Sequence, residues 1–241
     1  MEMKTMRRPS NRFLVSMTLL LVLPLTAVWT ISGLGIQWWD WWDVRTGAPA
    51  HPGAIERIDP DDPAHQFHYG EALQEHLAQY QFAVQYSKEH HIQSVADIAS
   101  GTCYGMKMLK EVVPVVDGYD REDFCGNYVI DLDKADWNRQ YDAIVSFETV
   151  EHLEKPEFFL VNAARSSPIL LLSTPVNTGP GNDFHKQLWT TEQFQELLER
   201  YYSCEYYHRV GDRYEPGHIG GVDLFAVCER RNPPPQSSSA R

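Results

Sequence analysis

The spacing of apolar and polar residues predicts a succession of helices and strands between residues 69 and 228. In residues 69–90, apolar side chains recur at three- and four-residue steps, as at Leu73, Leu77 and Tyr80, which is typical of an amphipathic helix. Short apolar runs, bounded by polar or turn residues, then predict buried strands. The predicted strands span 94–99, 115–119, 128–130, 142–147 and 169–173, and helical patterns fall at 106–112 and 156–164. This alternation predicts a doubly wound α/β sheet.

A helix and two further strands complete the pattern at the C-terminal end. The helix is predicted at 191–201, where Thr190 and Gln193 form the capping pattern that commonly begins a helix. The closing strands, 204–210 and 222–228, are expected to form an antiparallel C-terminal hairpin. The sequence therefore predicts a sheet of seven strands.

A separate apolar run, residues 13–36, carries no charged side chain. As a helix, it is long enough to cross a bilayer core of about 30 Å. It follows a basic segment, residues 1–12, and precedes a Trp-rich stretch, residues 38–42, that suits a bilayer interface. We therefore expect an N-terminal hydrophobic helix that anchors the chain in a membrane with a single pass. A cleaved signal peptide is the alternative, because small residues at 30–33 follow the run, and a start of translation downstream is a third interpretation.

The remaining segments have the composition of a linker, a domain and a tail. Residues 37–63 are rich in Pro, Gly, Ala and Asp and lack a sustained period, which predicts a linker. Residues 64–230 form the predicted domain, and residues 231–241, with their prolines and serine run, are predicted to be disordered. Basic residues before the apolar run, with Asp40 and Asp43 after it, place the N-terminus inside and the domain outside.

The net charge is acidic, with 21 Lys and Arg residues against 33 Asp and Glu residues and a formal charge of −12. A surface of this kind is not built to neutralise many phosphates, so the composition argues against a nucleic-acid partner. The four cysteines, Cys103, Cys125, Cys204 and Cys228, stand far apart, and none forms a Cys-x-x-Cys pair. We expect free thiols. Disulfides are the alternative, because the count is even and the N-terminus is directed to a membrane.

The stretch from Val95 to Gly105 carries the clearest chemical signal. A predicted strand ends at Asp97, a turn of small residues follows, and a helix comes next, so backbone amides are open to close approach by a ligand. The stretch resembles motif I of class I S-adenosylmethionine (SAM)-dependent methyltransferases, in the form typical of small-molecule and sugar-type enzymes. The resemblance implies a Rossmann-like fold and SAM as the cofactor. The implied cofactor contacts are Asp97, Ala99, Ser100, Gly101, Cys103 and Gly105.

Two positions depart from the glycines of that motif. Ala99 is a mild replacement, whereas the side chain of Cys103 is expected to face the methionine part of the cofactor and to narrow its approach. A weak or inactive SAM-binding protein is therefore one alternative. A dinucleotide-binding protein is another, but the chain lacks the Gly-x-Gly-x-x-Gly turn on which a pyrophosphate would lie.

Carboxylates at the ends of the second and third predicted strands extend the implied cofactor site. In the methyltransferase family a carboxylate after the second strand holds the ribose hydroxyls, which assigns Asp120, with Asp117 as the nearby competitor. A polar group after the third strand commonly lies near the adenine amino group, which assigns Asp131, with Asp133 as the alternative.

The stretch Asp142–Leu153 resembles motif IV of the same family. Phe147 and Glu148 within it are implied to contact the cofactor. The two motifs occur in the expected order on alternating strands, and the resemblance as a whole covers residues 71–228.

The same stretch supplies the predicted catalytic residues. Methyl transfer from a sulfonium mainly needs alignment of the nucleophile, and a base only where a proton must be removed. His152 is the predicted base, because its imidazole titrates near neutrality and it follows a strand end. Glu151 and His185 complete the predicted catalytic group.

Glu148, Glu151, His152 and His185 together also resemble the metal site of the small-RNA 3′-terminal 2′-O-methyltransferases. Mixed carboxylate and imidazole ligands suit Mn²⁺ or Mg²⁺. These residues occur in metal-free relatives as well, and the acidic charge disfavours RNA. No metal is therefore expected, and a metal-dependent RNA enzyme remains the alternative.

These patterns together predict a membrane-anchored, SAM-dependent methyltransferase. Its expected acceptor is a hydroxyl of a small molecule, a saccharide or a lipid-linked compound. The membrane anchor favours an acceptor in the membrane or the cell envelope. The predicted topology conflicts with the cytosolic origin of SAM, so the side of the membrane stays open.

Overall fold

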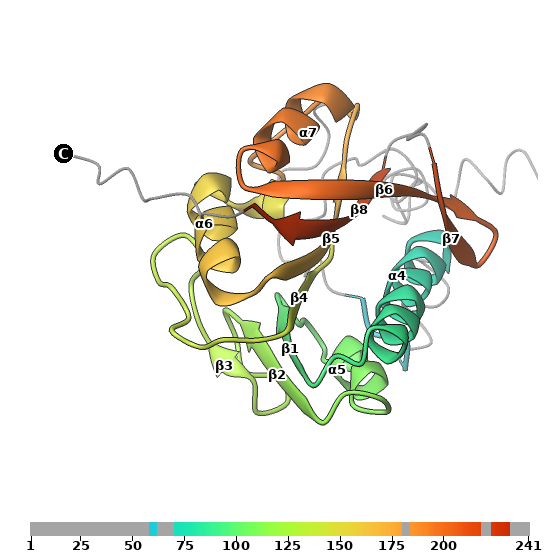
Figure 1. Ribbon diagram of the computed structural model, residues 1–241, viewed down its shortest axis with the longest axis vertical. Helices are drawn as coiled ribbons and strands as arrows, with labels where there is room; N and C mark the ends of the chain where they lie inside the picture. Colours follow the sequence, from blue (N-terminus) through green and yellow to red (C-terminus); the bar gives the residue numbers. More distant parts are fainter. Residues whose placement is uncertain (1–57, 62–69, 180–183, 218–222, 232–241) are drawn as a thin grey trace, which may run out of the picture. The chain divides into compact units, whose positions relative to one another are not determined.

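The computed structural model describes residues 58–61, 70–179, 184–217 and 223–231 (Figure 1). All of them belong to one compact unit, residues 46–241. The predicted basic segment, the apolar run at 13–36, most of the linker and the tail beyond residue 231 lie outside the described residues. Within the described part, no helix has both the length and the apolar character needed to span a membrane.

The secondary structure follows the predicted alternation of strands and helices. The strands are β1 (Ser94–Ile98), β2 (Val115–Asp120), β3 (Tyr128–Val129), β4 (Ala143–Ser146), β5 (Ile169–Pro175), β6 (Tyr202–Val210), β7 (Arg213–Pro216) and β8 (Asp223–Arg230). The helices are α4 (Gly70–Glu89), α5 (Tyr104–Leu109), the 3₁₀ turn η1 (Val150–His152), α6 (Pro156–Ser166) and α7 (Thr191–Glu199). The predicted capping box begins α7, where the Thr190 hydroxyl accepts from the Gln193 amide and the Gln193 side chain accepts from the Thr190 amide.

The described strands form one sheet in the order β3-β2-β1-β4-β5-β8-β6-β7. Neighbours among β1 to β5 are parallel, β8 is antiparallel to β5, and β6 is antiparallel to β8. The predicted doubly wound α/β fold, with its antiparallel C-terminal strands, is confirmed. The direction of strand order reverses between β1 and β4, and ligands of such sheets bind beyond the carboxyl ends of the strands at this point.

Two apolar layers cover the two faces of the sheet. Helices α4 and α5 lie on one face, and α6 and α7 lie on the other (Figure 1). The alternation of side chains along β5 shows the division, because Leu170 and Leu172 pack with α6 and α7 while Leu171 packs on the opposite side with Tyr80 and Met106. Each face thus buries one row of side chains from the same strand.

Within the described residues the sheet has eight strands rather than the predicted seven. The additional strand, β7, pairs with the end of β6 through Val210 and Arg213, which leaves Gly211 and Asp212 as a two-residue turn. Gly211 has a φ of 66°, a conformation that glycine adopts readily. The Gly-Asp pair between two strand-like runs is a hairpin signal that the sequence contains.

The expectation of free thiols is wrong, because all four cysteines form disulfides. Cys204 and Cys228 are opposite each other in the register of β6 and β8, and their Cα atoms are 4.0 Å apart. Strand pairing therefore brings together two thiols that lie 24 residues apart in the chain. The second disulfide joins Cys103 to Cys125 and belongs to the site described below.

Candidate functional site

A cavity of about 510 Å³ opens at the carboxyl ends of β1, β2 and β4. The predicted site residues that line it are Ala99, Ser100, Gly101, Asp120, Asp131, Phe147, Glu148 and His152. The other predicted residues, Asp97, Cys103, Gly105, Glu151 and His185, are not part of its lining. The structure therefore brings most of the implied cofactor contacts to one cavity, at the place where the topology predicts a ligand.

The loop between β1 and α5 turns sharply beside this cavity. Ala99, Gly101 and Cys103 all have positive φ angles, of 61°, 52° and 71°. A Cβ atom added at Gly101 would meet nothing within 4 Å, so the backbone there is open to approach from the cavity. The Gly101 amide donates to the carboxylate of Asp120 at 3.0 Å, which ties the loop to the end of β2.

Asp97 lies beneath this loop and is fully buried at the end of β1. Its Oδ1 accepts a hydrogen bond of 2.9 Å from the Tyr80 hydroxyl, whereas no described residue is a partner of Oδ2. Burial raises the pKa of Asp97 to about 7, the hydrogen bond from Tyr80 opposes the rise, and the charge of Asp120 adds to it. The buried hydroxyl of Ser100 likewise has no partner among the described residues.

Gly105 contributes through packing rather than through the cavity wall. A Cβ atom at this position would lie 2.1 Å from the Tyr80 ring. The same ring contacts Tyr104 and Phe147 edge to face, at centroid distances of 5.3 and 5.0 Å. Gly105 thus allows α4 and α5 to approach closely enough for Tyr80 to reach Asp97.

The side chain of Cys103 does not face the cavity, contrary to the expectation from the motif. It is 2% exposed, packs among the apolar residues of the α4 and α5 side, and is bonded to Cys125. Cys103 is not among the residues that line the cavity. The cysteine therefore does not narrow the cavity.

The competition between Asp120 and Asp117 is decided by their positions on β2. Asp120 is at the strand end and lines the cavity. Asp117 lies outside the cavity lining, accepts a hydrogen bond of 2.7 Å from the Tyr141 hydroxyl, and forms an ion pair with Arg139. Asp120 is thus the carboxylate that a cavity ligand meets.

Asp131 and Asp133 both line the cavity, but their carboxylates have different partners. Asp131 accepts from the Lys134 ammonium group at 2.7 Å, and this hydrogen bond lowers its pKa. Asp133 accepts from the backbone amides of Glu154 and Lys155 at 3.2 and 2.8 Å, just before α6 begins. The Asp133 carboxylate is therefore occupied by backbone amides that precede α6, and Asp131 is the better candidate for a ligand contact.

Glu148 lines the cavity two residues after the end of β4, and we call the part of the cavity around it the Glu148 end. It has a φ of 46°, and its carboxylate accepts a hydrogen bond of 2.6 Å from the Ser173 hydroxyl on β5. Burial raises the pKa of Glu148 well above its ordinary value, and the nearby charges of Glu151 and Asp223 raise it further. This end of the cavity therefore favours protonated or cation-paired carboxyl groups.

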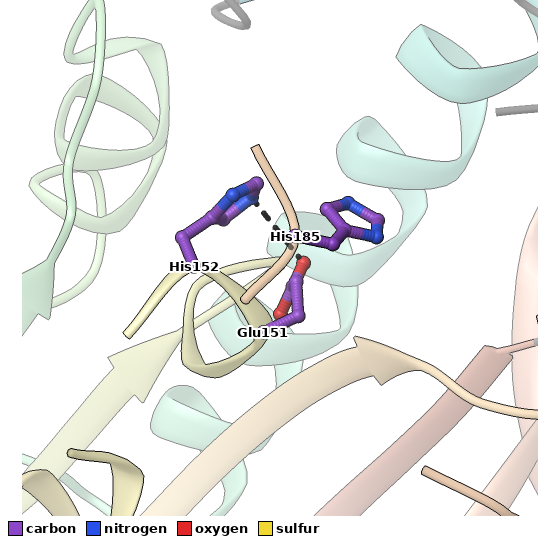
Figure 2. A group of neighbouring side chains, drawn as sticks. All are labelled: Glu151, His152 and His185. Atoms are coloured by element: carbon purple, nitrogen blue, oxygen red, sulfur yellow. Dashed lines mark ion pairs between the residues drawn. The ribbon is translucent and has the colours of Figure 1, made fainter. Parts of the chain in front are cut away.

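Glu151, His152 and His185 converge beside this end (Figure 2). One possible ligand atom from each lies within 4.8 Å of the others. His185 comes from a segment far along the chain, which is joined to η1 because the Lys186 and Gln187 amides both donate to the Glu151 carbonyl, at 2.7 and 3.0 Å. Glu148 is not part of this group.

His152 is oriented by two contacts. Its Nδ1 lies 3.1 Å from the carbonyl oxygen of Phe184, which suits an N–H donor, and its Nε2 lies 3.6 Å from Oε1 of Glu151. Glu151 is 1% exposed and its other oxygen accepts from Thr174 at 2.8 Å. Burial lowers the pKa of His152, so near neutral pH Nε2 carries a lone pair that can accept a proton or bind a metal ion.

Residues that the motif analysis did not assign also line the cavity. His76 and Tyr80 come from α4 and Tyr104 from the start of α5. His76 Nδ1 and the Tyr104 hydroxyl are 2.9 Å apart, and burial lowers the pKa of His76 to about 4. His76 and Tyr80 are one helical turn apart, and this i, i+4 pair of polar aromatic side chains on one helix face was the available signal.

No family model and no curated protein matches the chain, but solved structures do. A TehB-like SAM-dependent methyltransferase from Corynebacterium glutamicum aligns at 18% identity with a TM-score of 0.52, over 70% of this chain and 100% of its own. The N-terminal domain of EvdMO1, solved in the presence of SAH and D-fucose, aligns at 14% identity with a TM-score of 0.50, over 64% and 83%. The small RNA methyltransferase HEN1 aligns at 19% identity with a TM-score of 0.50, over 76% of this chain and 28% of its own.

The chain has the class I methyltransferase fold. The direction of strand order reverses between β1 and β4, and the cavity lies beside this point of the sheet. The predicted fold class and the resemblance to SAM-dependent methyltransferases are therefore confirmed at the level of the fold.

Proposed function

We propose that the chain is a SAM-dependent methyltransferase and that its cofactor binds in the cavity at the ends of β1, β2 and β4. The observation that carries this proposal is the open turn at Gly101 next to the carboxylate of Asp120. The structural neighbours are SAM-dependent methyltransferases, and EvdMO1 was solved with SAH, S-adenosylhomocysteine.

The donor set of the cavity fits this cofactor. SAM presents ribose hydroxyls, an ammonium group and an adenine amino group, all of which are hydrogen-bond donors. Asp120 and Asp131 offer carboxylate oxygens to such donors, and the buried Oδ2 of Asp97 has no described partner. An unpartnered buried acceptor is costly, so a donor supplied by the cofactor would stabilise this arrangement.

The residues at the Glu148 end can align an acceptor and remove its proton. Bound SAM supplies an activated methyl group. Nε2 of His152 accepts the proton of the acceptor hydroxyl, and Oε1 of Glu151, at 3.6 Å, stabilises the imidazolium that results. The Phe184 carbonyl holds the Nδ1 proton and so keeps Nε2 basic.

The acceptor that we propose is a hydroxyl of a small molecule, a saccharide or a lipid-linked compound. The net charge of −12 opposes a polyanionic acceptor, and EvdMO1 was solved in the presence of a sugar. We also propose that residues 13–36 anchor the domain to a membrane. Extraction of membranes at alkaline pH should leave the full chain in the pellet, and its release would contradict the anchor.

A metal-dependent RNA 2′-O-methyltransferase is a second candidate. The convergence of Glu151, His152 and His185 within 4.8 Å favours it, because a carboxylate and two imidazoles suit Mn²⁺. HEN1, a small RNA methyltransferase, has the same fold, although this chain spans only 28% of it.

Titration of the full-length chain with SAH tests the proposed cofactor site. We expect measurable affinity by calorimetry and a loss of about a hundredfold for Asp120→Asn, since a hydrogen bond to a charged group contributes roughly 1.5–3 kcal/mol. Asp117→Asn is the matched control on the same strand, because its carboxylate bonds to Tyr141 rather than lining the cavity. Absence of SAH binding by the unaltered chain would overturn the proposal.

Turnover assays then identify the acceptor. Incubation with SAM and a glycan, lipid or metabolite extract should yield a product heavier by one methyl group. Binding of SAH without any methylated product in these extracts or in RNA would instead support a SAM-binding protein without activity.

Manganese binding separates the two candidate functions. The metal-dependent enzyme requires stoichiometric Mn²⁺, measured by calorimetry, that His185→Ala abolishes and that the exposed-site control His90→Ala preserves. The metal-independent enzyme instead retains full turnover in the presence of a chelator.

A further inference from the structure

A disulfide joins the two loops that form the cofactor end of the cavity. Cys103 belongs to the β1–α5 loop, two residues after Gly101, and Cys125 belongs to the β2–β3 loop, five residues after Asp120. The first loop lines the cavity with Ser100, Gly101 and Thr102, and the second with Asp120, Arg121 and Glu122. The hydrogen bond between Gly101 and Asp120 is a non-covalent link between the same two loops.

We propose that the Cys103–Cys125 disulfide positions the cofactor-binding loops, so that SAM binds tightly to the oxidised protein and weakly to the reduced one. This inference rests on the proposed function, because it concerns the affinity of the same cavity for SAM. Cys103 and Cys125 are positioning residues, since neither side chain needs to touch the cofactor. The disulfide holds the Gly101 amide and the Asp120 carboxylate in the arrangement that a ligand meets.

The local structure shows why these loops need a covalent link. No helix separates β2 from β3, and the connecting residues form short-range bonds, such as those from the Asn127 side-chain amide to Glu122 and from the Phe124 amide to Asn127. Cys103 has a left-handed φ of 71°, which is unfavourable for a residue with a Cβ atom. Without the disulfide, this loop would be free to relax toward a more ordinary backbone conformation.

The two disulfides differ in their access to a reductant. Cys125 is exposed and Cys103 is buried, so a dithiol can attack the sulfur of Cys125 and release the Cys103 thiolate. The second thiolate of the reagent then displaces Cys125, so the protein gains two thiols and the dithiol becomes a cyclic disulfide. Cys228 is fully buried and Cys204 only partly exposed, so the pair between β6 and β8 is better protected.

The inference places the active form of the protein in an oxidising environment. Disulfides persist outside the cytosol and are reduced within it. The charge pattern around residues 13–36 predicts the same side of the membrane for this domain.

Affinity for SAH in matched variants tests the positioning role. Cys125→Ser removes the link and should weaken SAH binding by roughly tenfold, because the loops must then be ordered on binding. The double variant Cys204→Ser/Cys228→Ser removes the other disulfide, and we expect lower thermal stability with unchanged affinity. Adding Cys103→Gly to Cys125→Ser should recover part of the affinity, since glycine accepts the left-handed backbone. A purely structural role would not produce this rescue.

Stepwise reduction of the unaltered full chain gives an independent measurement. Limited dithiothreitol followed by alkylation should modify Cys103 and Cys125 first, as identified by peptide mass, and should lower SAH affinity to that of Cys125→Ser. Equal affinity of the oxidised and the selectively reduced protein would overturn the inference while leaving the proposed function intact. Absence of SAH binding by the oxidised protein would overturn the proposed function itself.

Discussion

The two ends of the cavity are built in different ways. At the cofactor end, backbone turns and carboxylates come from the ends of β1, β2 and β3 and the short segments after them. A main-chain amide makes one of the polar contacts between them, from Gly101 to Asp120. At the Glu148 end, side chains converge from distant parts of the chain, and His185 reaches η1 through the bonds of the next two residues to the Glu151 carbonyl. The cofactor end is therefore formed by residues close in sequence to the strand ends, whereas the Glu148 end forms only when distant segments pack together.

The electrostatics of the two ends differ as well. Asp131 at the cofactor end has a pKa lowered by Lys134, which keeps its carboxylate charged. Glu148 at the other end has a pKa raised by burial and by neighbouring acidic groups. A charged acceptor suits a ligand rich in hydroxyl and amino donors, whereas buried acids and imidazoles suit proton transfer or a bound cation. We therefore expect substitution of Asp120 or Asp131 to act mainly on cofactor binding, and substitution of His152 to act mainly on turnover.

The largest expected effect comes from His152→Ala. If Nε2 of His152 accepts the acceptor proton, its removal should lower kcat by about 10²- to 10⁴-fold, the range found for positioned general bases. SAH affinity should stay close to that of the unaltered chain, because His152 is at the Glu148 end. Rate assays on an identified acceptor, paired with calorimetry, measure both quantities.

The comparison with Asp120→Asn completes that test. Asp120→Asn should weaken SAH binding at the cofactor end, whereas His152→Ala should act on turnover. Equal kcat values for His152→Ala and the unaltered protein would show that no base acts through this imidazole, and would leave alignment as the source of catalysis.

The cofactor end was the more predictable of the two, because its residues follow their strands directly. Motif I and the strand ends placed Ala99, Gly101, Asp120 and Asp131 on the cavity before any tertiary contact was known. The fold was predictable for the same reason, since each face of β5 is encoded by alternating apolar residues. A period in the sequence is a local property, and the parallel sheet follows from the order of its elements.

Features that depend on tertiary pairing were missed. Sequence spacing does not indicate that Cys103 meets Cys125, and the partner of the Cys103 side chain is this cysteine rather than the cavity. The sequence predicts Tyr80 only as part of an amphipathic helix, whereas its hydroxyl donates to Asp97 of β1. Such contacts are set by how helices pack, and a single sequence carries little information about this packing.

The next largest effect is expected for Gly105→Ala, which tests how far the cofactor end depends on the packing of α4 against α5. The added Cβ would lie 2.1 Å from the ring of Tyr80, which is held by its bond to Asp97 and by Tyr104 and Phe147. We expect a loss of about 1–3 kcal/mol in the free energy of unfolding, the usual cost of overpacking, together with weaker SAH binding. Chemical denaturation measures the first quantity. Gly70→Ala is the matched control, since a Cβ there meets nothing within 4 Å.

The last prediction is a pH dependence of stability that arises from Asp97. Its pKa is raised from the ordinary value of 3.8 to about 7, chiefly by burial, so between these values the folded protein holds a proton that the unfolded chain has lost. The contribution of Asp97 to stability is therefore most favourable below about pH 4 and declines as the pH rises to about 7, by at most about 1.4 kcal/mol per pH unit.

Asp97→Asn keeps an acceptor for the Tyr80 hydroxyl and removes the titration, so its stability should decline less than that of the unaltered protein between pH 5 and 7. Denaturation curves at both pH values measure the difference, and parallel declines in the two proteins would mean that Asp97 is already ionised in the folded state at pH 5. Bound SAH should reduce the slope further if its ammonium group pairs with the charged form of Asp97, which would connect this buried carboxyl group to the cofactor end of the cavity.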